Sequence, residues 1–564
     1  MNYPLLDIQN LSIEFRADEE ITSAVKNVSF TIQKRKITAV VGESGSGKTV
    51  TSLSILQLLP SSAVITGSIL FHGKRDVQKD LLKSSGDEMR KIRGNQISMI
   101  FQEPMNSLNP VLTCGRQVME SILLHNEKNK KIAKEKTINL FKKVDLPDPE
   151  NIFKKFPHEL SGGQKQRVMI AMAVSCNPAL LIADEPTTAL DVTVQKTILN
   201  LLGDLQQDYD MGVIYISHDL NLVAEIADDV VVMYKGAVIE TGTTENIFTN
   251  PSHPYTKALL ACRPSANAKG LRLPQVSDFM NALNAEPKQI PSPVFTVDLH
   301  TKILQVQNLS VLFPIRKTFF GKPAAFIKAV DDISFDIYSG ETIGIVGESG
   351  SGKTTLGRTL MRLIHPDSGK IIYKGRELSK IPENEVRQLR KNIQIIFQDP
   401  YGSLNPRITI GNAISEPIKI HGLAPDSKKR KEKVYELLEK VDLKPEHFNR
   451  YPHQFSGGQR QRISIARALG LNPDLIICDE SVSALDVSVQ AQVLNLLNDL
   501  KKQLNFTCIF ISHDLQVVKY MSDRILVMNK GRIEESGTSE EIYFHPEKEY
   551  TKKLISAIPK GFKA

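Results

Sequence analysis

The chain of 564 residues is long enough for about two to four domains, each with its own hydrophobic core. Its five cysteines are scattered without metal-ligand spacing between them, and this usage is typical of reduced, cytosolic proteins. The formal net charge of +8 is a mild excess for this length, so it favours an ordinary solvated surface over a basic face for nucleic acid or membrane.

The amino terminus has neither a basic region nor a long apolar stretch, so we expect no signal peptide. The longest uncharged segment, residues 168–183, is interrupted by Asn177 and Pro178. It is also shorter than the roughly 20 apolar residues that a membrane-spanning helix needs. We therefore expect a protein that cannot itself form a membrane pore.

A glycine-rich octapeptide follows an apolar run at residues 37–41 that is typical of a buried strand. A helical pattern of apolar residues begins directly after it, which gives the strand, loop and helix context of a P-loop. In such a loop, backbone N–H groups and the helix dipole hold phosphate oxygens. We expect Lys48 to reach the β- and γ-phosphates and the Thr49 hydroxyl to ligate Mg²⁺. The octapeptide consists of Gly42, Glu43, Ser44, Gly45, Ser46, Gly47, Lys48 and Thr49.

The same octapeptide occurs a second time, which excludes a chance glycine-rich turn. Later residues repeat as well, because 305 residues separate Lys48 from Lys353 and 295 separate His218 from His513. A period this long indicates two whole domains rather than a solenoid. We expect these domains at residues 1–262 and 299–564, with the extra residues of the first copy around 74–87. The second octapeptide consists of Gly347, Glu348, Ser349, Gly350, Ser351, Gly352, Lys353 and Thr354.

Residues 263–298 form the predicted linker, which contains prolines at positions 264, 274, 287, 291 and 293. As a loose coil it would span about 30–36 Å, enough for the two domains to sit face to face. Its apolar residues predict that part of the linker docks on a domain; they are Leu271, Leu273, Phe279 and Met280.

Apolar runs in each domain lead to residues that can carry chemistry. In the first domain, residues 179–183 lead to Asp184 and Glu185, and residues 213–217 lead to His218. Continuous apolar runs favour central parallel strands covered on both faces. The corresponding residues of the second domain are Asp479, Glu480 and His513.

The alternation of these runs with helical segments predicts an α/β core, with ligands at the carboxyl ends of the strands. Residues 11–15 and 309–313 alternate apolar and polar residues, as half-buried strands do. The stretch from 105 to 173 is mostly helical in pattern. We therefore predict two α/β domains, each with a β subdomain and a helical subdomain.

Two further motifs stand between the phosphate loop and the carboxylate pair of each domain. They are Ile100-Phe101-Gln102 and Ser161-Gly162-Gly163-Gln164 in the first, and Ile396-Phe397-Gln398 and Ser456-Gly457-Gly458-Gln459 in the second. This order of motifs resembles the ATP-binding cassette of ABC proteins over nearly the whole chain outside the linker. The resemblance implies two tandem P-loop cassettes, each with a RecA-like core and a helical signature subdomain.

Phosphoryl transfer to water depends on charge neutralisation and positioning, which gives each motif a role. In the first domain, Asp184 would hold Mg²⁺ through its water shell, and Glu185 is the expected general base for the attacking water. His218 would contact the γ-phosphate, and Gln102 would sense Mg²⁺ and water. In the second domain these roles fall, in the same order, to Asp479, Glu480, His513 and Gln398, with Thr354 as the hydroxyl ligand of Mg²⁺.

In ABC proteins two cassettes pair head to tail, and each signature motif caps the ATP held by the other cassette. Carried over to this chain, Ser456 and Gly458 would complete the first site, and Ser161 and Gly163 would complete the second. We expect both sites to hydrolyse ATP, because neither copy has lost its lysine, glutamate, histidine or signature serine. Phe15 and Phe313 are candidates to stack on adenine, although packing in the strand core is an equal alternative.

Segments beside these motifs narrow the family. Ser107-Leu108-Asn109-Pro110 follows the first glutamine, and His253-Pro254-Tyr255-Thr256 closes the first domain. They look like the ATPase subunits of bacterial dipeptide/oligopeptide importers, fused here as in the peptide and glutathione import ATPases. The resemblance implies a peripheral ATPase on the cytoplasmic face of the inner membrane, with two permease subunits and a substrate-binding protein as partners and no nucleic acid. The cargo stays open between dipeptide, oligopeptide, glutathione, nickel chelate and peptide antibiotic.

Many members of that family carry a cysteine cluster for an iron–sulfur centre after the His-Pro-Tyr segment. Here only Cys262 follows it, so we expect ATP and Mg²⁺ as cofactors and no cluster. The alternative from another class is a soluble tandem ABC ATPase that acts on ribosomes as a translation factor. Such proteins have a long, highly charged helical linker, whereas this linker is broken by prolines and only modestly charged.

Overall fold

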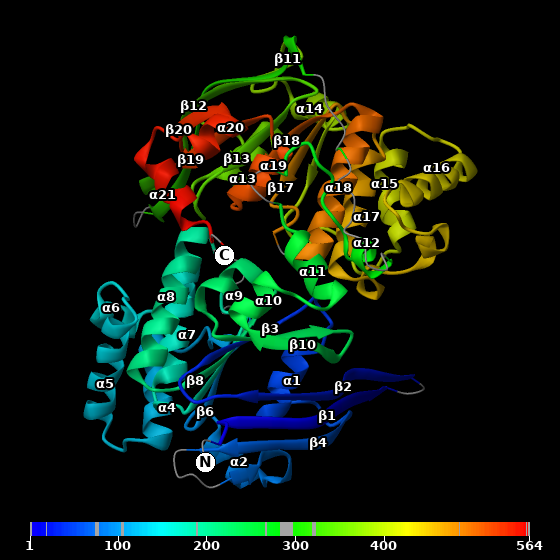
Figure 1. Cartoon of the computed structure of the whole chain (residues 1–564). Helices are drawn as coiled ribbons and strands as arrows, with labels where there is room; N and C mark the ends of the chain where they lie inside the picture. Colours follow the sequence, from blue (N-terminus) through cyan, green and yellow to red (C-terminus); the bar gives the residue numbers. More distant parts are fainter. Residues whose placement is uncertain are drawn as a thin grey trace.

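The computed structural model describes residues 3–17, 20–73, 78–102, 107–187, 190–264, 268–281, 291, 297–317, 323–483, 485–559 and 561. The chain forms two domains of the same build, with the first in the lower half of Figure 1 and the second in the upper half. The carboxyl-terminal helix α21 (Glu549–Ala557) contacts α8 (Val192–Asp208) of the first domain, so the end of the chain lies where the domains meet.

Each domain is built on a six-stranded sheet that is parallel except at one edge. The strand order is β10-β9-β3-β8-β7-β6 in the first domain and β16-β17-β18-β13-β19-β20 in the second. The central strands are buried at every position, as the continuous apolar runs predict. In the first sheet the strands are β3 (Ile37–Val41), β6 (Ile97–Ile100), β7 (Leu180–Asp184), β8 (Gly212–Ser217), β9 (Asp229–Tyr234) and β10 (Ala237–Thr243). In the second they are β13 (Thr342–Val346), β16 (Ile393–Ile396), β17 (Leu475–Asp479), β18 (Thr507–Ile511), β19 (Arg524–Asn529) and β20 (Arg532–Thr538).

A second, antiparallel sheet covers one side of each core. Leu11, Ile13 and Leu309 are fully buried and Val311 is nearly so, which confirms the alternating strands predicted there. The first of these sheets contains β1 (Leu6–Ala17), β2 (Glu20–Ile32), β4 (Ala63–His72) and β5 (Gln78–Asp80). The second contains β11 (Asp298–Lys317), β12 (Pro323–Ser339), β14 (Ser368–Tyr373) and β15 (Arg376–Glu377).

A helical subdomain projects from each core, as predicted for residues 105–173 (Figure 1). In the first domain it consists of α4 (Cys114–His125), α5 (Lys130–Lys143), α6 (Pro149–Lys154), η2 (Pro157–Glu159) and α7 (Gly162–Val174). In the second it consists of α15 (Ile410–Ile420), α16 (Ser427–Lys440), η3 (Pro445–Asn449), η4 (Pro452–Gln454) and α17 (Gly457–Leu469). The fold class predicted from the sequence is confirmed.

The remaining helices connect the strands of the two cores. In the first domain they are α1 (Lys48–Ile55), η1 (Leu81–Lys83), α2 (Gly86–Ile92), α8, α9 (Leu220–Ile226), α10 (Thr244–Thr249) and α11 (Pro254–Ala261), followed by α12 (Val276–Asn281) of the linker. In the second they are α13 (Lys353–Leu360), α14 (Glu383–Leu389), α18 (Val487–Leu504), α19 (Leu515–Met521), α20 (Ser539–Phe544) and α21. Of the predicted insertion at 74–87, residues 74–77 lie outside the described residues, and the rest forms β5, η1 and the start of α2. Within the described residues, no helix combines the length and apolar character that crossing a membrane requires.

The linker docks on the second domain through Leu273. This side chain is buried and belongs to the core cluster of that domain. The backbone N–H of Leu273 donates to Oδ1 of Asn495 at 3.0 Å, and Nδ2 of Asn495 donates back to the Leu273 carbonyl at 2.8 Å. Met280, by contrast, is 43% exposed, so only part of the apolar set docks. Residues 265–267, 282–290 and 292–296 of the linker lie outside the described residues.

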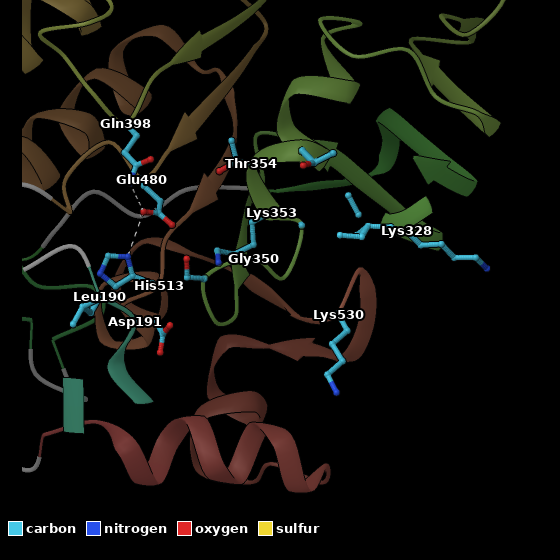
Figure 2. A pocket seen from close by; sticks show the side chains of 15 residues that line it. Leu190, Asp191, Lys328, Gly350, Lys353, Thr354, Gln398, Glu480, His513 and Lys530 are labelled. Atoms are coloured by element: carbon cyan, nitrogen blue, oxygen red, sulfur yellow. Dashed lines mark hydrogen bonds and ion pairs between the residues drawn. The ribbon is translucent and has the colours of Figure 1, made fainter. Parts of the chain in front are cut away.

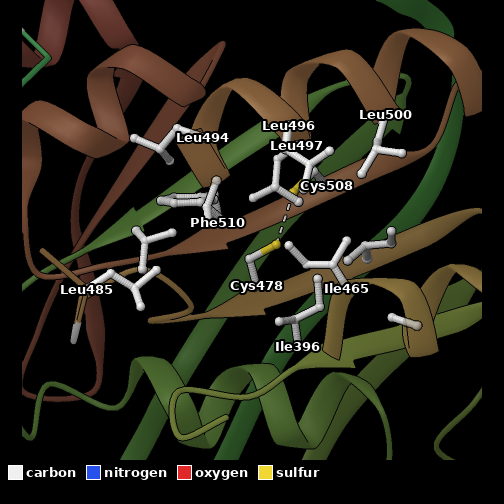
Figure 3. Close-up of a cluster of buried hydrophobic side chains, with 14 of the residues drawn as sticks. Ile396, Ile465, Cys478, Leu485, Leu494, Leu496, Leu497, Leu500, Cys508 and Phe510 are labelled. Carbon is white, nitrogen blue, oxygen red and sulfur yellow. Dashed lines mark hydrogen bonds between the residues drawn. The ribbon is translucent and has the colours of Figure 1, made fainter. Parts of the chain in front are cut away.

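Cys478 and Cys508 lie in the core of the second domain (Figure 3). They stand on the neighbouring strands β17 and β18, and their Sγ atoms are 4.0 Å apart. Leu497 of α18 and Phe510 of β18 pack in the same cluster. This core fixes the end of β17, where Asp479 and Glu480 begin the candidate site.

Candidate functional site

Each phosphate loop connects a buried central strand to a helix. Nζ of Lys48 donates to the carbonyls of Gly42 and Glu43 at 2.7 and 2.9 Å, and Lys353 repeats this geometry in the second loop. Gly47 has φ +98°, and a Cβ there would stand 2.8 Å from the Ala24 carbonyl oxygen, so only glycine fits. Burial lowers the pKa of both lysines. A phosphate arriving in the loop would offset the cost of burying these ammonium groups.

The predicted Mg²⁺ ligands of each domain lie together. The Thr49 hydroxyl donates to Oδ1 of Asp184 at 3.2 Å, and Thr354 donates to Oδ1 of Asp479 at 3.0 Å. Burial raises the pKa of Asp184 to about 6 and raises that of Asp479 as well. A divalent cation bound there would stabilise the charged carboxylates and so offset the effect of burial on their pKa. The described residues hold no cluster of three metal-ligating side chains, but Mg²⁺ commonly binds through one or two protein ligands with waters and substrate phosphates. The residues present therefore fit the ion.

The predicted catalytic side chains gather around one glutamate in each domain. Nε2 of Gln102 donates to Oε2 of Glu185 at 3.0 Å, and Nδ1 of His218 lies 3.2 Å from Oε1 of the same carboxylate. The second domain repeats the arrangement, with Gln398 at 2.8 Å and His513 at 3.4 Å from Oε2 of Glu480.

The glutamate is held as an acceptor beside its histidine. Although burial works against the charged imidazole, the hydrogen bond and charge of Glu185 raise the pKa of His218. In the second site burial favours the neutral carboxyl, but contact with His513 keeps the pKa of Glu480 below its usual value. Glu185 and Glu480 both have φ +46°, a left-handed conformation that is uncommon outside glycine and concentrates at functional sites.

Each phosphate loop also contacts the opposite domain. The backbone N–H of Ser44 donates to Oδ2 of Asp486 at 3.0 Å, and the Glu43 carboxylate accepts from Ser488. In the other direction, the Thr193 hydroxyl donates to Oε1 of Glu348 at 2.8 Å. The sequence repeats Ala-Leu-Asp at 189–191 and 484–486, but this local pattern does not predict a contact with residues so far away in the chain.

Figure 2 shows the second site from close by. Lys353, Thr354 and Glu480 line a cavity of about 440 Å³, and Leu190 and Asp191 of the first domain close it. The second site therefore includes residues of both domains, as the head-to-tail arrangement requires.

The signature serines have a different environment. Ser161 caps α7, with its Oγ accepting from the Gln164 N–H at 3.3 Å, and Ser456 caps α17 in the same way. Among the described residues that line the cavity at Lys353, the first domain contributes Leu190 and Asp191 and not Ser161 or Gly163. Completion of each site by the opposite signature stays a prediction.

The signature glycines pack against the helix that carries the opposite-domain contact. A Cβ on Gly163 would stand 2.9 Å from Val194 of α8, and one on Gly458 would stand 2.2 Å from Val489 of α18. Because α8 and α18 begin beside the opposite phosphate loops, the signature helices pack on the same helices that make the contacts between the domains.

The adenine candidates differ from each other. Phe15 is partly buried and packs against the core cluster of the antiparallel sheet, whereas Phe313 is 41% exposed. Phe313 pairs across the strands with Ile327, which lines the cavity at Lys353. Stacking on adenine stays a prediction for both residues.

Tyr255 and Tyr550 contact the phosphate loops, a role that the sequence analysis did not give them; it named Tyr255 only within the segment that narrows the family. The Tyr255 hydroxyl accepts from the backbone N–H of Glu43 at 3.0 Å, and Tyr550 accepts from Glu348 at 3.1 Å. Tyr255 is fully buried in the first turn of α11. Each tyrosine therefore holds the first peptide unit of its own phosphate loop. The occurrence of this tyrosine in both copies was the available signal.

Comparisons with known proteins agree with this geometry. A family model described as "ABC transporter" matches residues 25–188 and 330–483, and one described as "Oligopeptide/dipeptide transporter, C-terminal region" matches residues 239–287. The chain is 48% identical to the glutathione import ATP-binding protein GsiA of Escherichia coli O157:H7 over 98% of its length and 89% of that protein, and 47% identical to GsiA of strain K12 with the same coverage.

Among solved structures, a dimer of the ATP-binding cassette MJ0796 with ADP and Pi is 26% identical, with a TM-score of 0.38 over 42% of this chain and 98% of that one. None of these relatives supports the ribosome-acting alternative. The sequence-based predictions of two ABC cassettes, ATP hydrolysis and an import role are confirmed. The chain therefore belongs to the ABC transporter family, as a tandem ATP-hydrolysing subunit of the oligopeptide/dipeptide importer type.

Proposed function

We propose that this ATPase energises uptake of glutathione or short peptides through separate membrane permeases. The observation that carries the proposal is the likeness to glutathione import ATP-binding proteins over 98% of the chain, together with the transporter-specific match at 239–287. The test is uptake of labelled glutathione and labelled dipeptides by cells that express the chain with its permeases. Uptake of either cargo should stop when Lys48 and Lys353 are both changed to Ala. Uptake of both cargoes that persists in this double variant would refute the proposal.

We propose two composite ATP sites as the working machinery. Lys48 and the backbone N–H groups of its loop would hold the phosphates, while Thr49 and Asp184 would hold Mg²⁺, which neutralises phosphate charge when bound. Glu185 would then accept the proton of the attacking water, with His218 and Gln102 fixing its carboxylate. The 3.0 and 3.2 Å contacts to that carboxylate support these roles. The second site would use the equivalent set, Lys353, Thr354, Asp479, Glu480, His513 and Gln398.

Both sites would hydrolyse ATP. Each has the same set of lysine, glutamate, histidine and glutamine contacts, which supports equal chemistry. The ATPase rates of Glu185→Gln and Glu480→Gln, measured separately, test this. Each single variant should keep a substantial part of the rate and the double variant should lose it. Full activity in one variant and none in the other would mean that one site alone works.

We propose that Ser161 and Gly163 complete the second site, and Ser456 and Gly458 the first, when nucleotide binds. The capped start of α7 offers backbone N–H groups to an anion, and its packing on α8 ties it to the interface. Ser161→Cys paired with Ser349→Cys should form a disulfide across the domains in MgATP and less of it without nucleotide. All five natural cysteines are buried, which leaves the engineered pair as the reactive thiols. Equal cross-linking in both conditions would argue against closure by the signature.

The chain would act as a peripheral subunit on the cytoplasmic face of the membrane, held there by two permeases and supplied by a substrate-binding protein. Exposed apolar side chains beside the two glutamines support a protein contact there, with Phe101 41% and Tyr401 52% exposed. Phe101→Ser with Tyr401→Ser should therefore abolish co-purification of the permeases but leave nucleotide binding intact.

We place the domains at residues 1–262 and 299–564 with the linker between them. Cys262 is buried, and we propose no iron–sulfur cluster; stoichiometric iron in the purified protein would refute this.

A further inference from the structure

Arg263 stands where the two cassettes meet, directly after the last helix of the first cassette. Its side chain is 16% exposed, and its guanidinium contacts one carboxylate from each cassette. Nη1 pairs with Oδ1 of Asp219, and Nη2 lies 3.5 Å from Oδ2 of Asp514. The planar fork of arginine suits two carboxylates at once, which a lysine ammonium does not match.

The two aspartates occupy equivalent positions beside the catalytic histidines. Asp219 follows His218 and caps α9 by accepting from the Asn221 N–H at 3.0 Å. Asp514 follows His513 and caps α19 in the same manner, accepting at 2.8 Å from the next-but-one N–H. Each aspartate therefore fixes the turn that carries a histidine.

These contacts, together with the backbone between each histidine and the aspartate that follows it, connect the two catalytic glutamates. Glu185 contacts His218, whose neighbour Asp219 meets Arg263, and the same series runs through Asp514 to His513 and Glu480. A small cavity is lined by both histidines, both aspartates and Arg263, which places all five residues around one space.

The arginine occurs once, whereas the groups it contacts occur twice. At the repeat distance of 295 residues, which relates Tyr255 to Tyr550, the position equivalent to Arg263 is Ile558. Ile558 is buried and lines the same cavity. A single guanidinium thus contacts a carboxylate of each cassette. Without it, two negatively charged carboxylates would line the same small cavity without this positive charge between them.

The linker gives Arg263 a fixed place on both cassettes. On its amino-terminal side, α11 packs in the first cassette through Tyr255 and Leu259. On its carboxyl-terminal side, Leu273 is bonded to Asn495 of the second cassette. Described residues before and after Arg263 therefore pack on the first and on the second cassette, respectively.

We propose that Arg263 is a positioning residue that couples the two histidine turns, so that a change at one catalytic site alters turnover at the other. It touches no reacting atom and acts through Asp219 and Asp514. This inference rests on the proposed pair of ATP sites, and its test reads one site at a time.

The test measures steady-state ATP hydrolysis by the full-length chain in a Glu480→Gln background, where the first site alone turns over. Asp514→Asn lies in the opposite cassette and should change kcat of the first site by about 3- to 10-fold, in the lower part of the range for groups in one network. The same substitution should change kcat less than about 1.5-fold once Arg263→Met has removed the bridge. Arg263→Lys, which keeps the charge but not the fork, should restore part of the effect.

Two further variants separate coupling from a loss of folding. Arg272→Met removes another linker arginine, whose Nη1 lies 2.8 Å from Oδ2 of Asp499. This pair does not include the histidine turns, so the variant should leave the effect of Asp514→Asn on kcat intact. Asp219→Asn keeps Arg263 but weakens its contact with the first cassette, so it should also abolish the effect of Asp514→Asn on kcat. The proposal can therefore be tested even if Arg263→Met does not fold. The Glu185→Gln background, with Asp219→Asn as the distant change, gives the reciprocal measurement for the second site.

An Asp514→Asn effect of the same size with and without Arg263 would overturn the proposal, and so would the absence of any effect in both backgrounds. Full ATP hydrolysis in the Glu185→Gln, Glu480→Gln double variant would instead refute the two-site function, so the two failures are distinguishable.

Discussion

Tyr255→Phe should weaken ATP binding at the first site without changing the chemical step. The variant removes only the hydroxyl that accepts from the Glu43 N–H at 3.0 Å. A buried N–H that loses its partner costs about 1–3 kcal/mol. Because the same peptide unit also supplies the Gly42 carbonyl, which accepts from Lys48 at 2.7 Å, we expect the loss to fall on the loop conformation that receives phosphate.

A penalty at the lower end of that range, about 1.4 kcal/mol, corresponds to a tenfold weaker affinity. We expect KM for ATP to rise about tenfold and kcat to change less than about twofold, since the hydroxyl touches no reacting atom. The assay is steady-state hydrolysis in the Glu480→Gln background, which isolates the first site.

The matched control is Tyr234→Phe, whose ring centroid lies 4.2 Å from that of Tyr255. This variant removes a hydroxyl from the same ring pair but not the one that accepts from the loop, and it should leave KM near the parent value. An unchanged KM in Tyr255→Phe, or an equal rise in both variants, would refute the reasoning. Tyr550→Phe should act in the same way on the second site in the Glu185→Gln background.

Three further predictions concern stability. Leu273→Ala should remove about 2–3 kcal/mol by leaving a cavity where the linker docks, whereas Met280→Ala on the exposed side should change the thermal midpoint little; equal shifts would contradict the docking. Gly458→Ala should lower the free energy of unfolding by about 1–3 kcal/mol, because its Cβ would stand 2.2 Å from Val489, and a second change, Val489→Ala, should restore the stability. Gly457→Ala serves as the control, since its Cβ would stand 3.8 Å from the nearest side chain, Leu485. Burial raises the pKa of Asp184 from 3.8 to about 6, so the folded chain binds more protons than the unfolded chain between these two pH values. The free energy of unfolding of the nucleotide-free protein should therefore fall as pH rises through this window. Urea unfolding from pH 4 to 7 should show a flatter profile for Asp184→Asn, and parallel profiles would contradict the burial argument.

Much of the fold was predictable because its signals are local. The run Ile37–Val41 is apolar at four of five positions and is buried throughout, since a central parallel strand must be apolar on both faces. The phosphate loops, carboxylate pairs and histidines were predictable for a related reason. Their chemistry needs particular residue types at short, fixed spacing, and the repetition of each set removed the chance alternatives.

The interface between the cassettes was not predictable from these patterns. The bond from Ser44 to Asp486 joins residues 442 positions apart, and nothing in either segment encodes its partner. Arg263 left no repeated signal because its equivalent is Ile558. Phe15 and Phe313 occupy matching strand positions, yet Phe15 packs against the core and Phe313 is exposed. Both strands show the same alternation of apolar and polar residues, so this pattern could not predict the difference.

The composite nature of the ATP sites is tested most directly by placing a negative charge on each signature serine in turn. In the Glu480→Gln background, where the first site alone turns over, Ser456→Glu should abolish the remaining hydrolysis by repelling the phosphates held at Lys48. Ser161→Glu, which faces the site already silenced, should retain most of that hydrolysis. Loss of activity in Ser161→Glu with retention in Ser456→Glu would contradict the account, because each site would then be completed by its own cassette.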